Sequence, residues 1–140
     1  MSSHFNEPLF VISVAARLVK MHPQTLRKYE REGLIAPSRT QGNLRLYSDQ
    51  DIERLRQVKY LVEDRGLNLA GVQMVLEITR RLRDIRAFTA ERGRDHGDVE
   101  GYTALTSELD RMLRALGFVH EEQMTEIRRR DSVVPESGRG

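Results

Sequence analysis

The alternation of hydrophobic and polar positions predicts a short strand followed by a short helix near the start of the chain. The apolar run of residues 9–12 is typical of a strand, and Ser13 directly after it is a favourable helix N-cap. Residues 14–19 then show a helical pattern in which Val14 and Leu18, and as a further candidate Val19, are expected to face the core. The ordered part of the chain is therefore expected to open with a strand that leads into a helix.

A second helix is predicted after a tight connection. Pro23 suits the first helical position, because the N–H that proline lacks would have no partner there in any case. The helical pattern continues to about Glu32, and Gly33 is expected to end the helix in a left-handed conformation. Two short helices joined by about three residues are typical of a helix-turn-helix, whose second helix enters the DNA major groove.

A hairpin is predicted directly after this motif. Pro37 and the Gln-Gly-Asn turn at residues 41–43 punctuate the segment. Residues 44–47 alternate in the way that a strand does. A hairpin next to a helix-turn-helix is called a wing.

Two further helices follow the wing. Ser48 and Asp51 give an approximate capping signature for a helix over residues 49–64, which Gly66 ends. Asn68 is expected to cap the next helix. The expected buried positions are Ile52, Leu55, Val58 or Lys59, and Val62 in the third helix, and Leu69, Val72, Val75 and Leu76 in the fourth.

The second half of the chain has a different pattern. A helical stripe continues from Thr79 among arginines until the glycines at residues 93–97 are expected to break or loosen it. Apolar residues then recur at alternating spacings of three and four, which predicts a heptad seam for dimerisation. The seam residues are Tyr102, Leu105, Leu109, Met112, Leu116 and Val119.

These elements predict a mainly α-helical protein. We expect a winged helix-turn-helix DNA-binding domain over residues 9–78 and a helical, coiled-coil dimerisation region over residues 79–127. Residues 128–140 contain Pro, Ser and Gly with little apolar content, and we expect them to form a disordered tail.

The distribution of charge along the chain indicates a polyanionic partner, although the net charge alone does not. The whole chain carries a formal net charge of only +2. Residues 13–47, however, hold seven basic residues and two acids, whereas residues 67–140 hold twelve arginines and thirteen acids. A local basic surplus is the electrostatic footprint of a nucleic-acid-binding surface.

Several classes of function receive no support from the composition. The chain has no cysteine, which excludes disulfides, thiolate metal sites and thiol redox sensing. Its four histidines are scattered at no ligand spacing, and no catalytic pair is evident, so we expect neither a metal, a cofactor nor an enzyme. No apolar run approaches the ~20 residues of a membrane span, and no signal peptide is evident. We therefore expect a cytoplasmic protein.

The second helix and the wing supply the candidate DNA-contact residues. Gln24, Lys28 and Arg31 share an outward face of the helix, with Thr25 beside them. Gln24, Thr25 and Lys28 can meet base edges, whereas Arg27, Tyr29 and Arg31 are long enough to reach flanking phosphates. A solvated amphipathic helix is the alternative for this helix taken alone. Basic residues on both arms of the wing favour DNA, because a purely structural hairpin has no need of them. The candidate DNA-contact residues are Gln24, Thr25, Arg27, Lys28, Tyr29, Arg31, Arg39, Asn43, Arg45 and Tyr47.

These stretches also resemble a known family. VISVAARLVKMHPQTLRKYEREGLIAPSRT, GNLRLYS, DIERLRQV and GLNLAGVQMVLE resemble the DNA-binding domain of the MerR family, and within it the HspR-type heat-shock repressors. The resemblance covers about half of the chain, from Phe10 to Leu76, and fades after Leu82. It implies an antiparallel coiled-coil dimer, a palindromic operator and family DNA-contact positions. Those positions are Thr25, Arg27, Tyr29, Arg45 and Tyr47.

The resemblance therefore predicts a dimeric repressor of heat-shock or chaperone genes that binds an inverted-repeat operator, with the DnaK chaperone as co-repressor. Two alternatives remain open at this point. A ligand-responsive MerR-family activator is one, although the roughly 64 residues after Leu76 leave little room for a separate ligand domain. An excisionase-like, DNA-bending architectural protein is the other, although such proteins usually lack a dimerisation seam.

Overall fold

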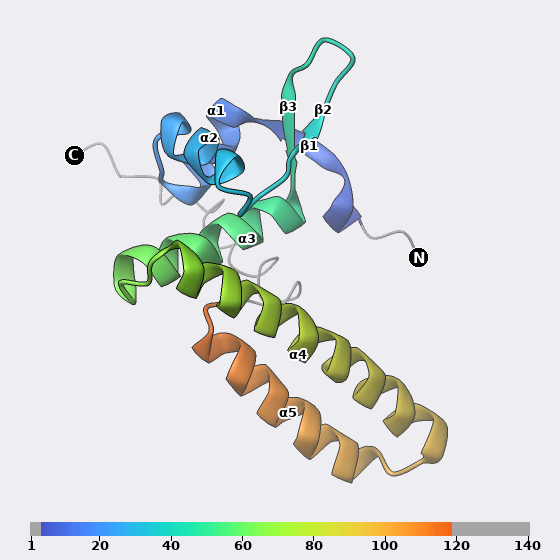
Figure 1. Cartoon of the computed structure of the whole chain (residues 1–140). Coiled ribbons are helices and arrows are strands. Elements are labelled where there is room, and N and C mark those ends of the chain that lie inside the picture. Colours follow the sequence, from blue (N-terminus) through green and yellow to red (C-terminus); the bar gives the residue numbers. More distant parts are fainter. Residues whose placement is uncertain (1–3, 119–140) are drawn as a thin grey trace, which may run out of the picture.

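The computed structural model describes residues 4–118, which form a compact head and a long helical hairpin that extends from it (Figure 1). The head contains the first three α-helices and a small sheet, and the hairpin consists of the last two helices. This confirms the predicted mainly helical, winged helix-turn-helix architecture. In chain order, the elements are η1 (His4–Asn6), β1 (Pro8–Val11), α1 (Ile12–Val19), α2 (Pro23–Arg31), β2 (Ser38–Arg39), β3 (Arg45–Ser48), α3 (Asp49–Lys59), η2 (Tyr60–Asp64), α4 (Leu69–His96) and α5 (Val99–Ala115).

The helix α1 starts earlier than its sequence pattern predicts. Ser13 is not the N-cap, because Val11 occupies that position without a side-chain cap and Ile12 is already helical. Val11 is paired with Leu46 in the sheet, so the extended conformation ends there and the helix begins at once. The buried residues of α1 are Ala15, Ala16 and Val19, whereas Val14 and Leu18 are half-buried.

The recognition helix α2 follows the predicted local signals closely. Pro23 is at its first position, and the Nδ1 atom of His22 accepts a hydrogen bond from the Gln24 N–H at 3.0 Å. Gly33 has a φ of 76°, a left-handed conformation that suits glycine. The predicted start and end of this helix are therefore confirmed.

The wing belongs to a three-stranded antiparallel sheet with the order β1-β3-β2. Arg39 of β2 lies directly opposite Arg45 of β3 in the register. The turn between the two strands contains Asn43, whose φ is 63°, and the Thr40 N–H donates to the Leu44 carbonyl at 2.9 Å. Asparagine tolerates this conformation better than most side chains, so Asn43 has a clear structural role in the turn.

The helix α3 forms the centre of the core of the head. Its N-terminus has the full capping box of Ser48 and Asp51. The predicted inward positions are confirmed for Ile52, Leu55 and Val58, which have no exposed surface. After Lys59 the chain continues as the π-helical turn η2, where Leu61 is buried and Val62 only half-buried.

The helix α4 is continuous over its 28 residues. Asn68 caps it as predicted by accepting from the Gly71 N–H at 2.9 Å. Val72 and Leu76 are buried and Val75 packs partly against the core, but Leu69 is 41% exposed, because it is the first residue of the helix and lies beyond the core. The break expected at residues 93–97 is confirmed at Gly97, the left-handed C-cap that follows His96 and whose φ is 70°, whereas Gly93 lies inside the helix.

A close contact explains why glycine occurs inside α4. A Cβ atom on Gly93 would lie 2.6 Å from the Cβ atom of Tyr102, well inside van der Waals contact. Gly93 therefore lets α5 approach α4 closely at the far end of the hairpin, and it does so without interrupting the helix.

The predicted heptad seam is divided between two faces of α5. Leu109 is buried, as is Leu113, which the seam did not include, and Tyr102 and Leu116 are half-buried. These residues lie in the hairpin with α4 within a single chain, where Arg86 also pairs with Asp110. Leu105 and Met112, in contrast, are 49% and 44% exposed. Val119, the last predicted seam residue, lies outside the described residues.

Candidate nucleic-acid interface

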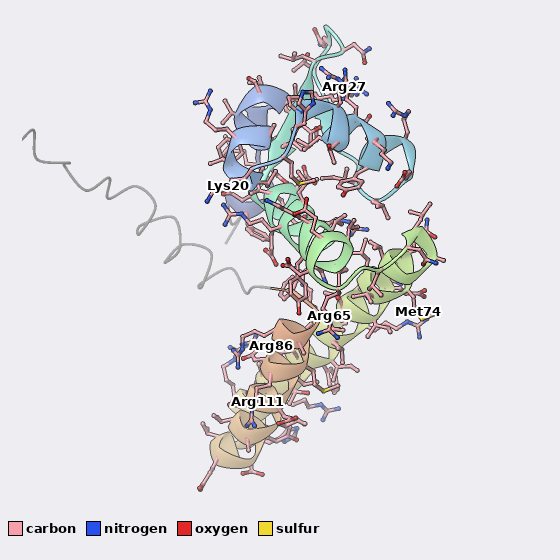
Figure 2. The ribbon with its side chains drawn as sticks, turned by 90° about the vertical axis from the view of Figure 1, so that its left-hand side faces the viewer. Lys20, Arg27, Arg65, Met74, Arg86 and Arg111 are labelled. Atoms are coloured by element: carbon pink, nitrogen blue, oxygen red, sulfur yellow. The ribbon has the colours of Figure 1, made fainter. Side chains whose placement is uncertain are left out.

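One face of α2 presents polar and basic side chains to solvent. Gln24, Lys28 and Arg31 are exposed, and Thr25 and Arg27 are half-buried beside them. The opposite face carries Leu26, which is fully buried. Figure 2 shows Arg27 on the head, far from Arg111 on the hairpin. The structure therefore brings the predicted helix residues together on one accessible surface.

The two candidate tyrosines lie in the core instead. Tyr47 has no exposed surface, and its hydroxyl has no hydrogen-bond partner within residues 4–118. Burial raises the pKa of the Tyr47 hydroxyl, and the Glu30 charge raises it further. The contact of Tyr47 with DNA stays a prediction, and the burial of the side chain does not support it, because a fully buried side chain offers no atom to a phosphate.

Tyr29 is also a core residue, with only 7% of its surface exposed. Burial raises the pKa of its hydroxyl, and the charges of Glu63 and Glu32 act in the same direction. The hydroxyl therefore stays protonated and neutral. Its ring supports α2 from behind, which differs from the phosphate-contacting role that the sequence predicts.

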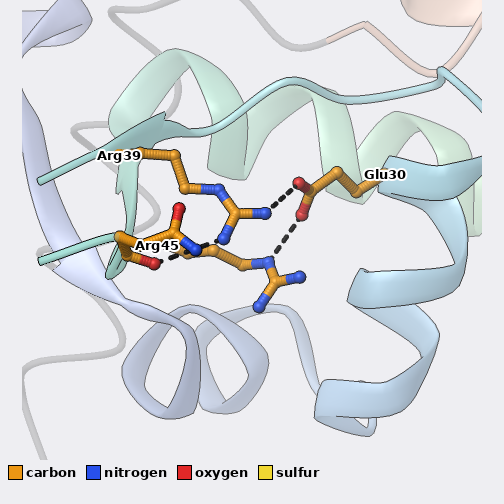
Figure 3. A network of polar contacts seen from close by, with 4 residues as sticks. Glu30, Arg39 and Arg45 are labelled. Carbon is orange, nitrogen blue, oxygen red and sulfur yellow. Dashed lines mark hydrogen bonds and ion pairs between the residues drawn. The ribbon is translucent and has the colours of Figure 1, made fainter.

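A shared carboxylate joins the recognition helix to the wing (Figure 3). Arg39 Nη2 donates to Glu30 Oε1 at 2.6 Å, and Arg45 Nε donates to Glu30 Oε2 at 2.6 Å. Arg39 Nη1 also donates to the Asn43 carbonyl at 3.3 Å. Both arms of the wing are thus bonded to one side chain of α2, so the helix and the wing are held together as one unit.

The electrostatics of this trio favour the charged form of Glu30. Burial alone would raise the pKa of the carboxyl, but the hydrogen bonds and charges of Arg45 and Arg39 outweigh it and lower the pKa. Two guanidinium groups against one carboxylate leave a surplus of one positive charge. Each arginine has five N–H donors, so each retains donors that can face a phosphate.

This geometry corrects one argument from sequence. A structural hairpin was expected to have no need of basic residues, yet Arg39 and Arg45 stabilise the wing by bonding Glu30. Glu30 itself is absent from the predicted site residues. The signal that points to Glu30 is a single acid among the basic residues of α2, followed by an arginine on each arm of a hairpin.

Two further residues, not predicted from sequence, hold the turn of the helix-turn-helix. Arg56 Nη2 donates to the Leu18 carbonyl at 3.2 Å. Lys59 Nζ donates to the Val19 and Lys20 carbonyls at 3.2 and 3.1 Å. Cationic side chains at the C-terminal end of a helix satisfy its unpaired carbonyls and its dipole. The helix α3 therefore anchors the end of α1, from which α2 is positioned.

Other kinds of site are not apparent in the part of the chain that the structure describes. Residues 4–118 contain no group of three His, Asp or Glu side chains that could hold a metal ion. No helix in the same range is both long and apolar enough to cross a membrane.

An exposed basic recognition helix bonded to a basic wing defines a DNA-binding protein of the winged helix-turn-helix class. Residues 10–78 match the family model for the MerR HTH family regulatory protein. The chain therefore contains a DNA-binding domain of the MerR family.

Comparisons with individual proteins agree with this assignment. The chain is 51% identical over 84 residues to the putative heat shock protein HspR of Streptomyces coelicolor, covering 60% of this chain and 56% of that protein. It is 42% identical over 69 residues to the regulator GlnR of Bacillus anthracis, covering 49% of this chain and 53% of that protein. The chain thus spans about half the length of these curated relatives.

One solved structure is also similar. The transcription regulator PbrR691 from Ralstonia metallidurans CH34, crystallised in complex with lead(II), is 26% identical with a TM-score of 0.48. The match covers 86% of this chain and 87% of that one.

Proposed function

We propose that this MerR-family regulator is a sequence-specific repressor of heat-shock or chaperone genes that binds an inverted-repeat operator as a dimer. DNA binding is supported above all by the ion pairs that join α2 to the wing, because the two joined elements present one basic surface. The heat-shock assignment is supported by the identity to HspR, which extends over 84 residues.

The contact residues divide into two groups by their place on this unit. Gln24, Thr25 and Lys28 lie on the N-terminal two-thirds of α2 and are proposed to meet base edges in the major groove. The arginines around them are proposed to contact phosphates, which position the protein without reading sequence. These are Arg27, Arg31, Arg39 and Arg45.

The dimer interface is proposed to lie on the exposed apolar face of the hairpin. On α4, the residues of this face are 42–64% exposed and fall on one side of the helix at spacings of four, seven and three. On α5, Leu105 and Met112 lie seven residues apart and are similarly exposed. A second copy of the chain would bury these side chains. The α4 residues are Met74, Ile78, Ile85 and Phe88, of which Figure 2 labels Met74.

This proposal revises the dimerisation residues expected from the heptads. Leu109, like the half-buried Tyr102 and Leu116, belongs to the side of α5 that packs within the chain. Only Leu105 and Met112 of the predicted seam remain exposed among the described residues. We retain a head over residues 9–78 and a dimerisation region from residue 79 onwards, with α4 as the single helix that connects them.

DnaK is proposed as the co-repressor, on the strength of the similarity to the HspR type. The physical requirement is that the chaperone bind the repressor–operator complex more tightly than the free repressor, since only a difference in affinity shifts the equilibrium. Unfolded proteins would then withdraw the chaperone during heat stress and release the operator. Such a regulator acts in the cytoplasm, where the chromosome and the chaperone are both present.

A genome-wide occupancy map before and after heat shock tests the proposed function. We expect occupancy at inverted repeats upstream of chaperone genes, lost on heating. Operator affinity measured with and without DnaK, at growth and heat-shock temperatures, tests the mechanism. Occupancy that avoids chaperone genes would contradict the heat-shock assignment. Affinity that collapses on heating regardless of DnaK would instead indicate a repressor that melts by itself.

A further inference from the structure

One buried amide of the head is bonded to both helices of the hairpin. Gln57 lies on α3 and is only 2% exposed. Its Nε2 atom donates to the Thr79 Oγ1 atom of α4 at 2.8 Å and to the Leu116 carbonyl at the end of α5 at 3.0 Å. Thr79 is also buried, and its hydroxyl donates in turn to the Val75 carbonyl at 2.8 Å. A single side chain of the head thus connects two helices that are far apart in the sequence.

The helix α3 has two buried faces of different chemistry. Ile52, Leu55 and Val58 belong to the apolar core of the head. Glu53 and Gln57, four residues apart, form a second buried face that is polar. A buried polar side chain costs stability unless it is hydrogen-bonded, so packing alone would favour an apolar residue at position 57. The two bonds of the amide therefore indicate a role beyond filling space.

The end of α5 is fitted to its surroundings at the same place. Gly117 follows Leu116 with a φ of 83°, and a Cβ atom there would lie 2.5 Å from the Cδ1 atom of Tyr60 in η2. Phe118 is buried, and the centre of its ring lies 4.6 Å from the guanidinium carbon of Arg83 on α4. Three successive residues at the end of α5 therefore contact three different elements, and the hairpin is held to the head through both of its helices.

Hydrogen bonds fix an orientation more sharply than apolar packing does. Val72 and Leu76 of α4 join the core of the head, but the burial of apolar surface has no preferred direction. The amide of Gln57 must meet two acceptors, on two helices, within narrow ranges of distance and angle. A rotation of the hairpin against the head would break at least one bond and leave a buried polar group unpaired. The two bonds therefore favour one orientation of the head on the hairpin.

We propose that Gln57 fixes the orientation of the head on the hairpin and thereby determines which half-site spacing the dimer accepts. The inference rests on the proposed function, because only a dimer on an inverted repeat has a spacing to select. In such a dimer the hairpins join the two copies, so the orientation of each head places its recognition helix. One inserted base pair moves a half-site by about 3.4 Å and rotates it by about 34°. Gln57 is buried and acts on DNA recognition only as a positioning residue.

The test begins by selecting DNA from a random library with the purified full chain. The spacer of the recovered inverted repeat is then shortened or lengthened by one base pair. The wild type is expected to lose affinity about tenfold for either change. Gln57→Met keeps the length of the side chain but removes both donors, and it is expected to reduce this loss to about threefold. Affinity for DNA with a single half-site should be unchanged, because the surface of α2 and the wing is intact.

Control variants separate positioning from stability. Gln50→Met makes the same substitution at an exposed position of α3. Ile52→Val removes one core methyl group from the same helix and lowers the stability of the head. Both variants should retain the spacing preference of the wild type. On α4, Thr79→Val removes one acceptor of the amide and should broaden the preference, whereas Thr79→Ser keeps the hydroxyl and should not. Circular dichroism verifies folding, and the two Thr79 variants decide the test if Gln57→Met does not fold.

Three outcomes would overturn the proposal. An unchanged spacing preference in both Gln57→Met and Thr79→Val would show that the bonds only stabilise the fold. An equally broadened preference in Ile52→Val would attribute the effect to lost stability. A wild type that selects single, unrepeated sites would contradict the proposed binding to inverted repeats, and the inference would fail together with that function.

Discussion

Arg39 and Arg45 lie directly opposite each other on the wing and bond the two oxygens of the same carboxylate, that of Glu30. Like charges in this cross-strand position repel each other and destabilise a hairpin. Glu30 removes the repulsion and at the same time attaches the hairpin to α2. The recognition helix therefore controls how the wing is presented to DNA.

Glu30→Gln is expected to lower the free energy of unfolding by about 1 kcal/mol, since the pairs are partly exposed and screened by solvent. The two arginines would then face each other with no carboxylate between them. Urea unfolding measures the loss. Glu32→Gln is the control, because Glu32 lies 3.9 Å from Lys28 in a looser pair. Equal losses of unfolding free energy in the two variants would show that the bonds of Glu30 to the two arginines stabilise the fold no more than the Glu32–Lys28 pair does.

The contribution of Glu30 is expected to depend on pH. Its pKa in the folded protein is lowered, so the unfolded chain binds the proton more readily. The stabilisation is therefore fully present above the ordinary carboxyl pKa of about 4.3 and is lost as the pH falls through the folded value. The difference in unfolding free energy between wild type and Glu30→Gln should shrink under acidic conditions. A difference that grows on acidification would have the wrong sign for this mechanism.

Base-reading and phosphate-contacting residues are expected to differ in how their loss affects binding. Lys28→Ala or Gln24→Ala should relax sequence preference by about 1–3 kcal/mol per lost base contact. Arg27→Ala should weaken binding to every sequence and reduce the salt dependence by about one unit of slope. Titrations of specific and scrambled DNA at several salt concentrations measure both effects. Arg111→Gln on the hairpin serves as the control and should change neither quantity.

The exposed and the internal face of the helical hairpin are expected to respond differently to an introduced carboxylate. Met112→Glu and Phe88→Glu should yield folded monomers, because both side chains are exposed in the single chain. Leu109→Glu should unfold the hairpin, because Leu109 is 6% exposed and a carboxylate there would lose its hydration. Light scattering with circular dichroism distinguishes the two results. A wild type that is monomeric at micromolar concentration would refute the proposed dimer.

Local signals in the sequence predicted the boundaries of several elements. Each of these signals acts on backbone groups within a few residues of itself. The signals are Pro23, Gly33, the pair of Ser48 and Asp51, and Asn68. Their effect is therefore readable from neighbouring residues alone. The failure at Ser13 has a long-range cause, since the start of α1 depends on pairing between Val11 and Leu46, which are far apart in the chain.

The candidate site was predictable only in part for the same reason. Spacing along a helix places Gln24, Lys28 and Arg31 on one face, and the structure agrees. Spacing does not reveal that Tyr47 is covered by the core or that Glu30 meets both arms of the wing. A heptad pattern likewise marks apolar faces of α5 without indicating whether α4 or another chain covers each face.

The unbroken helix from the head to the tip of the hairpin makes α4 a lever arm. Its 28 residues span about 42 Å at 1.5 Å per residue. A tilt of about 10° at the Asn68 end would displace the tip by about 7 Å, roughly the rise of two base pairs. Gly93 lies inside this helix without breaking it and allows α5 to pack closely against its far end. In a dimer joined through such arms, a small rotation where the head meets the hairpin would change the separation of the two recognition helices, so that they would no longer match the spacing of an operator.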